Sequence, residues 1–275
     1  MRPEVQSALT PFLKTVAASD EAALLLDYDG TLAPFRTQRD QAYPYPGVAL
    51  VLQEIVRDCR TRVVVMSGRD ATDVLPFLNI HPRPEVWGIH GLQRMKTDGT
   101  MEMPSLDDRT LDALSDADRW LGHQQLRHSA EFKAGSIAVH WRGMSETEVN
   151  DLRARVMLGW RPIAEQSGLD LLEFDGGVEV RASEADKGDA VRTFLSEINP
   201  NVPVAYLGDD TTDESAFLAL RDRGISVLVR PTWRETAAQF WLQPPDELLD
   251  FLGLWLKTCV DHNAAIRGAA KAMNR

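Results

Sequence analysis

Short runs of apolar residues recur along the chain, and each is followed by small, polar or acidic residues. Runs of this length are typical of strands that are buried on both faces of a parallel sheet. Between the runs, apolar residues recur at helical spacing, as from Val48 to Cys59. This alternation predicts an α/β fold with a doubly wound, Rossmann-like parallel sheet. The expected strands are Ala22–Leu26, Val63–Met66, Val202–Leu207 and Ile225–Val229.

The middle of the chain has a different pattern, in which helical stretches alternate with strand-like ones. The order helix, strand, helix and two strands predicts a compact α+β unit inserted into the α/β chain. We place this second domain at residues 104–182, so that residues 1–103 and 183–275 form the two parts of the core domain. The expected elements of the insertion are Leu106–Leu121, Ser136–Arg142, Glu146–Gln166, Leu169–Phe174 and Gly177–Val180.

Composition and charge narrow the classes of protein to which the chain can belong. Of its 275 residues 44% are hydrophobic and 26% are charged, which is ordinary for a globular protein and argues against a disordered or fibrous chain. Lysine and arginine total 30 against 41 acidic residues, a net charge of −11. This negative charge disfavours nucleic acid or an anionic membrane as the partner.

Two further features bear on the cellular compartment. The N-terminal segment lacks the long apolar core of a secretory signal, and no apolar stretch is long enough to span a bilayer. The two cysteines, Cys59 and Cys259, match neither a disulfide framework nor a zinc-binding spacing. We therefore expect a cytoplasmic protein with two reduced thiols, acting as a monomer on a small molecule.

Two acidic residues, Asp27 and Asp29, come directly after the first apolar run, in the segment DYDGTL. Carboxylates two positions apart at the end of a strand project together and attract a hard divalent cation such as Mg²⁺. One of the pair could attack phosphorus while its neighbour transfers the proton. The alternatives are an exposed acidic turn or a calcium loop, although Gly30 falls at the fourth position where a calcium loop needs glycine at the sixth.

Two later segments carry groups that suit an anion. Ser67, Gly68 and Arg69 follow the second run, where a hydroxyl, backbone N–H groups and a helix N-terminus could cradle a phosphate. Lys187 opens a predicted helix and offers a point charge for phosphate. Each segment has an ordinary structural alternative, a helix-capping serine in the first and a surface lysine in the second.

Four acidic residues lie close together after the third run, in the segment GDDTTDE at 208–214. Unpaired carboxylates at this spacing would repel one another, and a bound cation would relieve the repulsion. Because ligands of such sheets sit at the carboxyl ends of the strands, the four motifs would together supply a nucleophile, an anion cradle, a cation and a metal site. Phosphoryl transfer requires these parts, and the cations would locally offset the negative charge of the protein.

The DGTL-containing segment at 27–32, Ser67, Lys187 and the GDDTTD segment at 208–213 together resemble the haloacid dehalogenase superfamily of phosphohydrolases. By that resemblance Asp27 would be the catalytic nucleophile and Asp29 the general acid/base. Ser67 and Lys187 would hold the phosphoryl group during its transfer.

The same resemblance implies that Mg²⁺ is the cofactor. Its ligands would be Asp27, Asp209 and the backbone carbonyl of Asp29, with Asp210 and Asp213 supporting the site. The insertion between Ser67 and Lys187 would be a cap domain that determines which substrate is accepted.

Longer segments are similar to the trehalose-6-phosphate phosphatase family over most of residues 20–245; they include LLLDYDGTLAPF, VVVMSGRD, VWGIHGLQ, EFKAGSIAVHWR and YLGDDTTDESAF. This resemblance implies hydrolysis of trehalose 6-phosphate to trehalose and phosphate through an aspartyl-phosphate, the last step of trehalose biosynthesis. It also implies that Glu131, Lys133 and Glu179 bind the sugar hydroxyls, for which fixed donors and acceptors give strong selection. The other expected substrate-binding residues are Gly68, Arg69, His90, His140 and Arg142.

Two places depart from the family pattern. Arg181 and Ala182 follow Glu179 where many members have lysine and proline, and Trp141 stands where tyrosine is usual. Without the resemblance, we would interpret Glu131 and Lys133 as an exposed strand edge and His140 as a hydrogen-bonded core histidine. Three alternatives therefore stay open: a phosphatase of another sugar phosphate, a phosphomannomutase-like phosphotransferase, and a non-catalytic module that binds a sugar phosphate.

Overall fold

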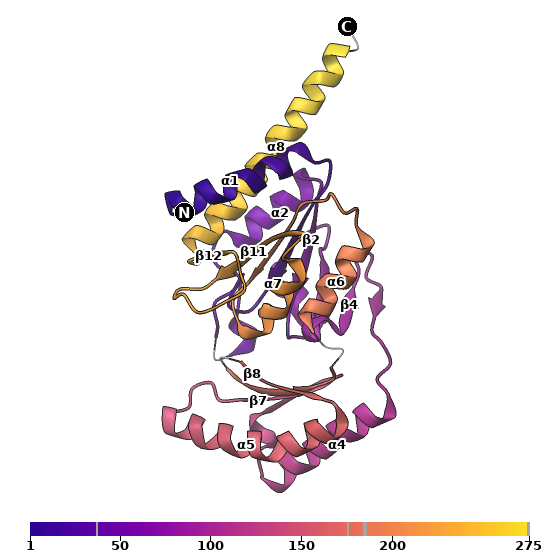
Figure 1. Ribbon diagram of the computed structural model, residues 1–275, viewed down its shortest axis with the longest axis vertical. Helices are drawn as coiled ribbons and strands as arrows, with labels where there is room; N and C mark the ends of the chain where they lie inside the picture. Colours follow the sequence, from indigo (N-terminus) through magenta and orange to yellow (C-terminus); the bar gives the residue numbers. More distant parts are fainter. Residues whose placement is uncertain (37, 175, 184–185, 274–275) are drawn as a thin grey trace.

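The computed structural model describes residues 1–36, 38–174, 176–183 and 186–273. Its core contains an eight-stranded sheet in the order β12-β11-β10-β1-β2-β3-β4-β5 (Figure 1). The strands from β12 to β3 are parallel, whereas β4 and β5 pair antiparallel at one edge. The predicted α/β class is confirmed, and the four expected strands form the centre of the sheet. The strands are β1 Ala22–Asp27, β2 Thr61–Met66, β3 Glu85–Gly88, β4 Gln93–Met95, β5 Met101–Glu102, β10 Val204–Gly208, β11 Gly224–Val229 and β12 Phe240–Leu242.

Helices cover both faces of this sheet (Figure 1). Residues of α1, α2, α3 and α8 pack against one face, and residues of α6 and α7 pack against the other. Along β1, Leu24 and Leu26 point into the first cluster and Leu25 into the second. A strand covered on both sides has no solvent-facing positions, which explains its uninterrupted apolar run. The helices are α1 Pro3–Ala18, α2 Val48–Asp58, α3 Ala71–Leu78, α6 Lys187–Glu197, α7 Glu214–Leu220 and α8 Asp246–Met273.

The inserted unit has its own four-stranded antiparallel sheet, in the order β6-β7-β9-β8. Helices α4 and α5 cover the face of this sheet that points away from the core (Figure 1), and Val139, Val178 and Trp160 pack in the cluster between them. Strand β6 was not expected, because its four residues alternate too briefly to stand out from a loop. The elements are α4 Asp108–His123, β6 Ala130–Lys133, β7 Ser136–His140, α5 Glu146–Ser167, β8 Asp170–Phe174 and β9 Gly177–Arg181.

The open face of the inserted sheet lies opposite the end of the core at which the parallel strands terminate (Figure 1). Ligands of doubly wound sheets bind at this end, so the fold directs the segments that follow β1, β2 and β10 toward the insertion. None of the described helices combines the length and the apolar character that a membrane span requires.

Candidate active site

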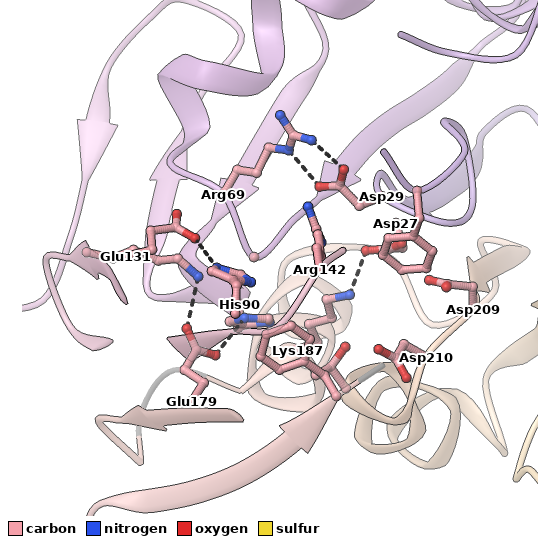
Figure 2. A pocket seen from close by; sticks show the side chains of 16 residues that line it. Asp27, Asp29, Arg69, His90, Glu131, Arg142, Glu179, Lys187, Asp209 and Asp210 are labelled. Carbon is pink, nitrogen blue, oxygen red and sulfur yellow. Dashed lines mark hydrogen bonds and ion pairs between the residues drawn. The ribbon is translucent and has the colours of Figure 1, made fainter. Parts of the chain in front are cut away.

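A pocket lies between the core and the inserted sheet, and Figure 2 shows its lining from close by. All but two of the residues expected at the site line it, drawn from both domains. The lining residues are Asp27, Asp29, Phe35, Gly68, Arg69, His90, Glu131, Lys133, His140, Arg142, Phe174, Glu179, Lys187, Asp209, Asp210 and Thr212.

Lys187 joins two carboxylates at the core side of the pocket. Its Nζ donates to Asp27 Oδ1 and to Asp213 Oδ1, both at 2.6 Å, and its side chain is buried. It is the first residue of α6, where Asp186 caps the helix. Burial disfavours the charged ammonium, but the attraction of Asp213 and Asp27 outweighs it and raises the pKa of Lys187. Lys187 therefore stays a cation at every physiological pH.

Asp213 is one of the two expected residues that do not line the pocket, and it lies behind Lys187. Besides Lys187, it accepts hydrogen bonds from Tyr206 Oη at 2.6 Å and from the backbone N–H groups of Asp209 and Asp210 at 3.0 and 3.1 Å. Burial raises the pKa of Asp213. The attraction of Lys187 and these hydrogen bonds lower that pKa by more than burial raises it, so the net shift is downward. With its oxygens engaged in this way, Asp213 is suited to hold the loop after β10 in place.

The carboxylates of Asp27, Asp209 and Asp213 come together closely enough to share one cation, with an oxygen of each within 4.8 Å of the others. Asp27 Oδ2 is buried and has no hydrogen-bond partner among the residues that the structure describes. Burial, followed by repulsion from Asp27 and Asp213, raises the pKa of Asp209 well above its usual value. Burial raises the pKa of Asp27 to about 7, against the opposing attraction of Lys187. Carboxylate oxygens are hard donors, and a bound Mg²⁺ would offset the repulsion between these buried carboxylates.

Gly30 permits this arrangement at the loop after β1. Its φ is +90°, and a Cβ at this position would lie 2.0 Å from Asp209 Oδ2. Any other side chain would push the Asp209 carboxylate away from Asp27. The glycine of the DGTL segment is therefore required for close approach as well as for the turn.

Asp29 forms an ion pair with Arg69. The guanidinium of Arg69 donates two hydrogen bonds to the Asp29 carboxylate, at 2.6 and 2.5 Å (Figure 2), and Arg69 is 3% exposed. The rings of Tyr28 and Phe77 flank the guanidinium at 5.5 Å. Arg69, which was expected to contact the substrate, is therefore placed to orient the Asp29 carboxylate.

Ser67, the other expected residue that does not line the pocket, is fully buried at the end of β2. Its Oγ accepts a hydrogen bond from the Arg69 N–H at 3.0 Å, and its backbone carbonyl accepts one from His90 at 2.9 Å. Gly68 does line the pocket, and a Cβ there would lie 2.7 Å from the His90 ring. The turn after β2 is therefore packed directly against the loop that carries His90.

The cap side of the pocket contains two buried or half-buried carboxylates with cationic or aromatic partners (Figure 2). Glu179 accepts from Lys133 at 2.9 Å and lies 2.9 Å from Nε2 of His90, which belongs to the core. His140 Nε2 lies 2.8 Å from Glu131. Arg142 donates to the backbone carbonyl of Arg36 in the core at 3.1 Å, which is a second direct link between the domains.

Four residues of the site were missed by sequence reasoning. Phe35 and Phe174 line the pocket from the core and the cap respectively, and Thr212 lies beside Asp210 and Asp213. Tyr206 holds Asp213 from a fully buried position. Phe35, Tyr206 and Thr212 belong to motif segments that were recognised for other residues. Phe174 ends an apolar run, and nothing in the local sequence indicates that its ring lines a pocket.

Comparison with known proteins identifies the family. The trehalose-phosphatase family profile matches residues 25–246. The trehalose-phosphate phosphatases of Mycobacterium marinum and Mycobacterium leprae are each 30% identical, over 84% and 89% of this chain, and the chain spans 60% and 61% of their lengths. The C-terminal domain of the Candida albicans trehalose-6-phosphate phosphatase is 20% identical and superposes with a TM-score of 0.78 over 90% of this chain and 96% of that domain. A haloacid dehalogenase-like hydrolase from Bacillus subtilis shares the fold with a TM-score of 0.60, at 17% identity over 84% of this chain and 98% of its own. The chain therefore belongs to the trehalose-phosphatase family.

Proposed function

We propose that this protein is a Mg²⁺-dependent phosphatase that hydrolyses trehalose 6-phosphate to trehalose and phosphate, the last step of trehalose biosynthesis. The observation that carries the proposal is the buried Asp27 Oδ2, which lacks a partner among the described residues beside the charged Lys187. A carboxylate oxygen in this position is available as a nucleophile toward phosphorus and as a metal ligand. The chain spans only about three fifths of its mycobacterial relatives, so their activity is carried over here as a proposal.

The proposed reaction has two steps at Asp27. In the first, the Asp27 carboxylate forms a bond to phosphorus, the bond from phosphorus to the sugar oxygen breaks, and Asp29 gives that oxygen a proton. In the second, Asp29 takes a proton from a water molecule, whose oxygen displaces the phosphate from Asp27 and restores the carboxylate. Arg69 holds Asp29 ready for the second step, in which a carboxylate is required.

Mg²⁺, when bound by Asp27, Asp209 and the backbone carbonyl of Asp29, would supply positive charge for the phosphoryl oxygens. Lys187 adds a second charge on the same group, and the backbone N–H of Gly68, which lines the pocket in the turn after Ser67, would add a hydrogen bond. In this proposal Asp210 and Asp213 act indirectly, by holding the loop that carries Asp209.

We propose that the cap selects the sugar. Glu131, Lys133 and Glu179 offer charged donors and acceptors, with His90, His140 and Arg142 beside them. Phe35 and Phe174 add apolar surfaces of the kind on which the faces of a pyranose ring can lie. In the structure these polar groups pair with one another, so the hydroxyl groups of a bound sugar would replace existing hydrogen bonds. A ligand without the matching hydroxyls could not replace these hydrogen bonds and would therefore bind poorly.

A phosphomannomutase-like reaction is less well supported by the cap. It needs a second phosphate site there, but Glu131 and Glu179 place two carboxylates beside the basic residues of that surface. We further propose residues 104–182 as the specificity cap between the core segments 1–103 and 183–275. We also propose that the protein acts in the cytoplasm as a monomer.

A phosphate-release assay tests the proposed function. Purified protein is incubated with trehalose 6-phosphate, glucose 6-phosphate and mannose 6-phosphate, with Mg²⁺ or with EDTA. We expect Mg²⁺-dependent release of phosphate, fastest from trehalose 6-phosphate, and less than about 1% of that rate for Asp27→Asn. Asp112→Asn, an exposed cap carboxylate, is the control and should behave as the wild type. Isomer formation without phosphate release would instead indicate a mutase, and binding without turnover a non-catalytic module.

A further inference from the structure

The two cysteines, which the sequence separates widely, come close together in the fold. Cys59 directly follows α2 and Cys259 lies on α8, and their thiols are near enough to shift each other's pKa. Thr61, at the start of β2, places its Oγ1 3.7 Å from Cys259 Sγ. Helices α2 and α8 pack side by side on one face of the core sheet, so this proximity results from an extensive contact.

Both thiols lie at the amino-terminal edge of the core strands, away from the active site. Cys59 is half-buried and lines a surface pocket with Arg60 and Thr61. Cys259 is 8% exposed and lines an adjoining pocket with the same two residues. Small solutes can therefore approach the pair without entering the catalytic pocket.

The two thiols differ in reactivity. The Cys59 thiol and the Thr61 hydroxyl, whose Oγ1 lies 3.7 Å from Cys259 Sγ, lower the pKa of Cys259 against the effect of its burial. Cys59 has the opposite shift, because the neighbouring Cys259 and its own burial raise its pKa. Since the thiolate is the nucleophile, we expect Cys259 to react first with an electrophile.

We propose that Cys59 and Cys259 form a reversible oxidation site, at which hydrogen peroxide converts the two thiols into an intramolecular disulfide. The Cys259 thiolate attacks one peroxide oxygen, the O–O bond breaks, and the released hydroxide takes up a proton to leave as water. Cys59 then gives up its proton and attacks the sulfur of the sulfenic acid, whose S–O bond breaks with release of a second water. Two thiols lose two electrons and two protons, and one peroxide is reduced to two water molecules.

The disulfide would attach α8 to the end of α2. It would close a loop that contains most of the core and the whole cap, which restricts the unfolded chain more than a short loop does. The catalytic groups lie at the opposite end of the strands, so oxidation would stabilise the core without changing the chemistry at Asp27.

The test uses the fully reduced full-length protein, treated with a small excess of hydrogen peroxide. We expect both thiols to disappear together, with a monomeric product that has lost two hydrogen atoms and a Cys59–Cys259 cross-linked peptide in its digest. Dithiothreitol should reverse the change, and the oxidised form should melt about 4 °C or more above the reduced form. The reaction should be at least about tenfold faster in the folded protein than in urea, where the thiols are no longer held together.

Single substitutions separate the two roles. In Cys59→Ser we expect a sulfenic acid at Cys259 that dimedone traps, and in Cys259→Ser we expect slower oxidation of Cys59. If a serine variant does not fold, the corresponding cysteine-to-alanine variant is used in its place. Cross-links between molecules, oxidation of each thiol separately to sulfonic acid, or equal rates in buffer and in urea would each overturn the proposal. Phosphatase activity plays no part in these readouts, so they stand apart from the proposed function.

Discussion

Glu179 on the cap and His90 on the core are joined across the domain boundary, with Glu179 Oε2 2.9 Å from His90 Nε2. The other oxygen of Glu179 accepts hydrogen bonds from Lys133 at 2.9 Å and from Ser136 at 2.7 Å. Burial by itself would raise the pKa of Glu179, but the attraction of Lys133 and His90 reverses the shift and holds that pKa well below 4.5. One buried carboxylate on β9 thus connects three cap strands, β6, β7 and β9, to the core.

Replacing Glu179 by glutamine should destabilise the protein by about 3 kcal/mol at pH 7, because the substitution leaves the buried Lys133 ammonium without its counter-ion. The folded-state pKa lies below the unfolded one, so this stabilisation is present above about pH 4.5 and is lost as the pH falls through the folded-state pKa. Urea unfolding at pH 7 and at lower pH should show the difference between wild type and Glu179→Gln shrinking as the pH falls. Glu165→Gln, on the exposed side of α5, is the control, and a difference that does not vary with pH would contradict this explanation.

Glu131 should matter for the sugar and much less for the phosphoryl group. We expect Glu131→Ala to lower kcat/KM for trehalose 6-phosphate by about 100-fold, because a sugar hydroxyl and His140 would both lose a partner. Turnover of p-nitrophenyl phosphate, which has no sugar, should change less than about threefold. Equal losses on the two substrates would show that Glu131 does not act through the sugar.

Arg69→Lys distinguishes a residue that positions Asp29 from one that binds substrate. A lysine cannot reproduce the two parallel hydrogen bonds of the guanidinium, so Asp29 would lose its fixed orientation. We expect kcat to fall by about 10- to 100-fold on trehalose 6-phosphate and on p-nitrophenyl phosphate alike, with little change in KM. An increase confined to the KM of trehalose 6-phosphate would instead support the contact with substrate expected from the sequence.

Mg²⁺ should stabilise the folded protein through Asp27 and Asp209. When Mg²⁺ is present at about 100 times its dissociation constant, we expect about 2.7 kcal/mol of added stability, visible as a higher Tm than in EDTA. Asp209→Asn should abolish most of this Mg²⁺-dependent shift, because it removes one of the three carboxylates that lie close enough to share a cation. Asp112→Asn should keep the shift, and a Tm that is the same with Mg²⁺ and with EDTA in the wild type would contradict a cation site here.

Much of the core could be predicted from local patterns. The apolar runs predicted β1, β2, β10 and β11 because a strand covered on both faces needs apolar side chains at successive positions. Once those strands are parallel neighbours, the residues that follow them must meet at one edge, which is why Asp27 and Asp209 could be expected together. The cap was harder to predict. Strand β6 has only four residues, and its pairing with β7 identifies it as a strand more clearly than its own sequence does.

The sequence by itself therefore determined the class of the fold, the acidic ends of its strands and the family to which the chain belongs. Only the tertiary structure decided that Arg69 pairs with Asp29, that Ser67 is buried, that Glu179 joins the cap to His90, and that the two cysteines are neighbours. The physical reason is that periodicity and turn chemistry act over a few residues, whereas each of these contacts depends on how whole elements pack. Side chains far apart along the chain become partners only when burial forces their polar groups to find one another.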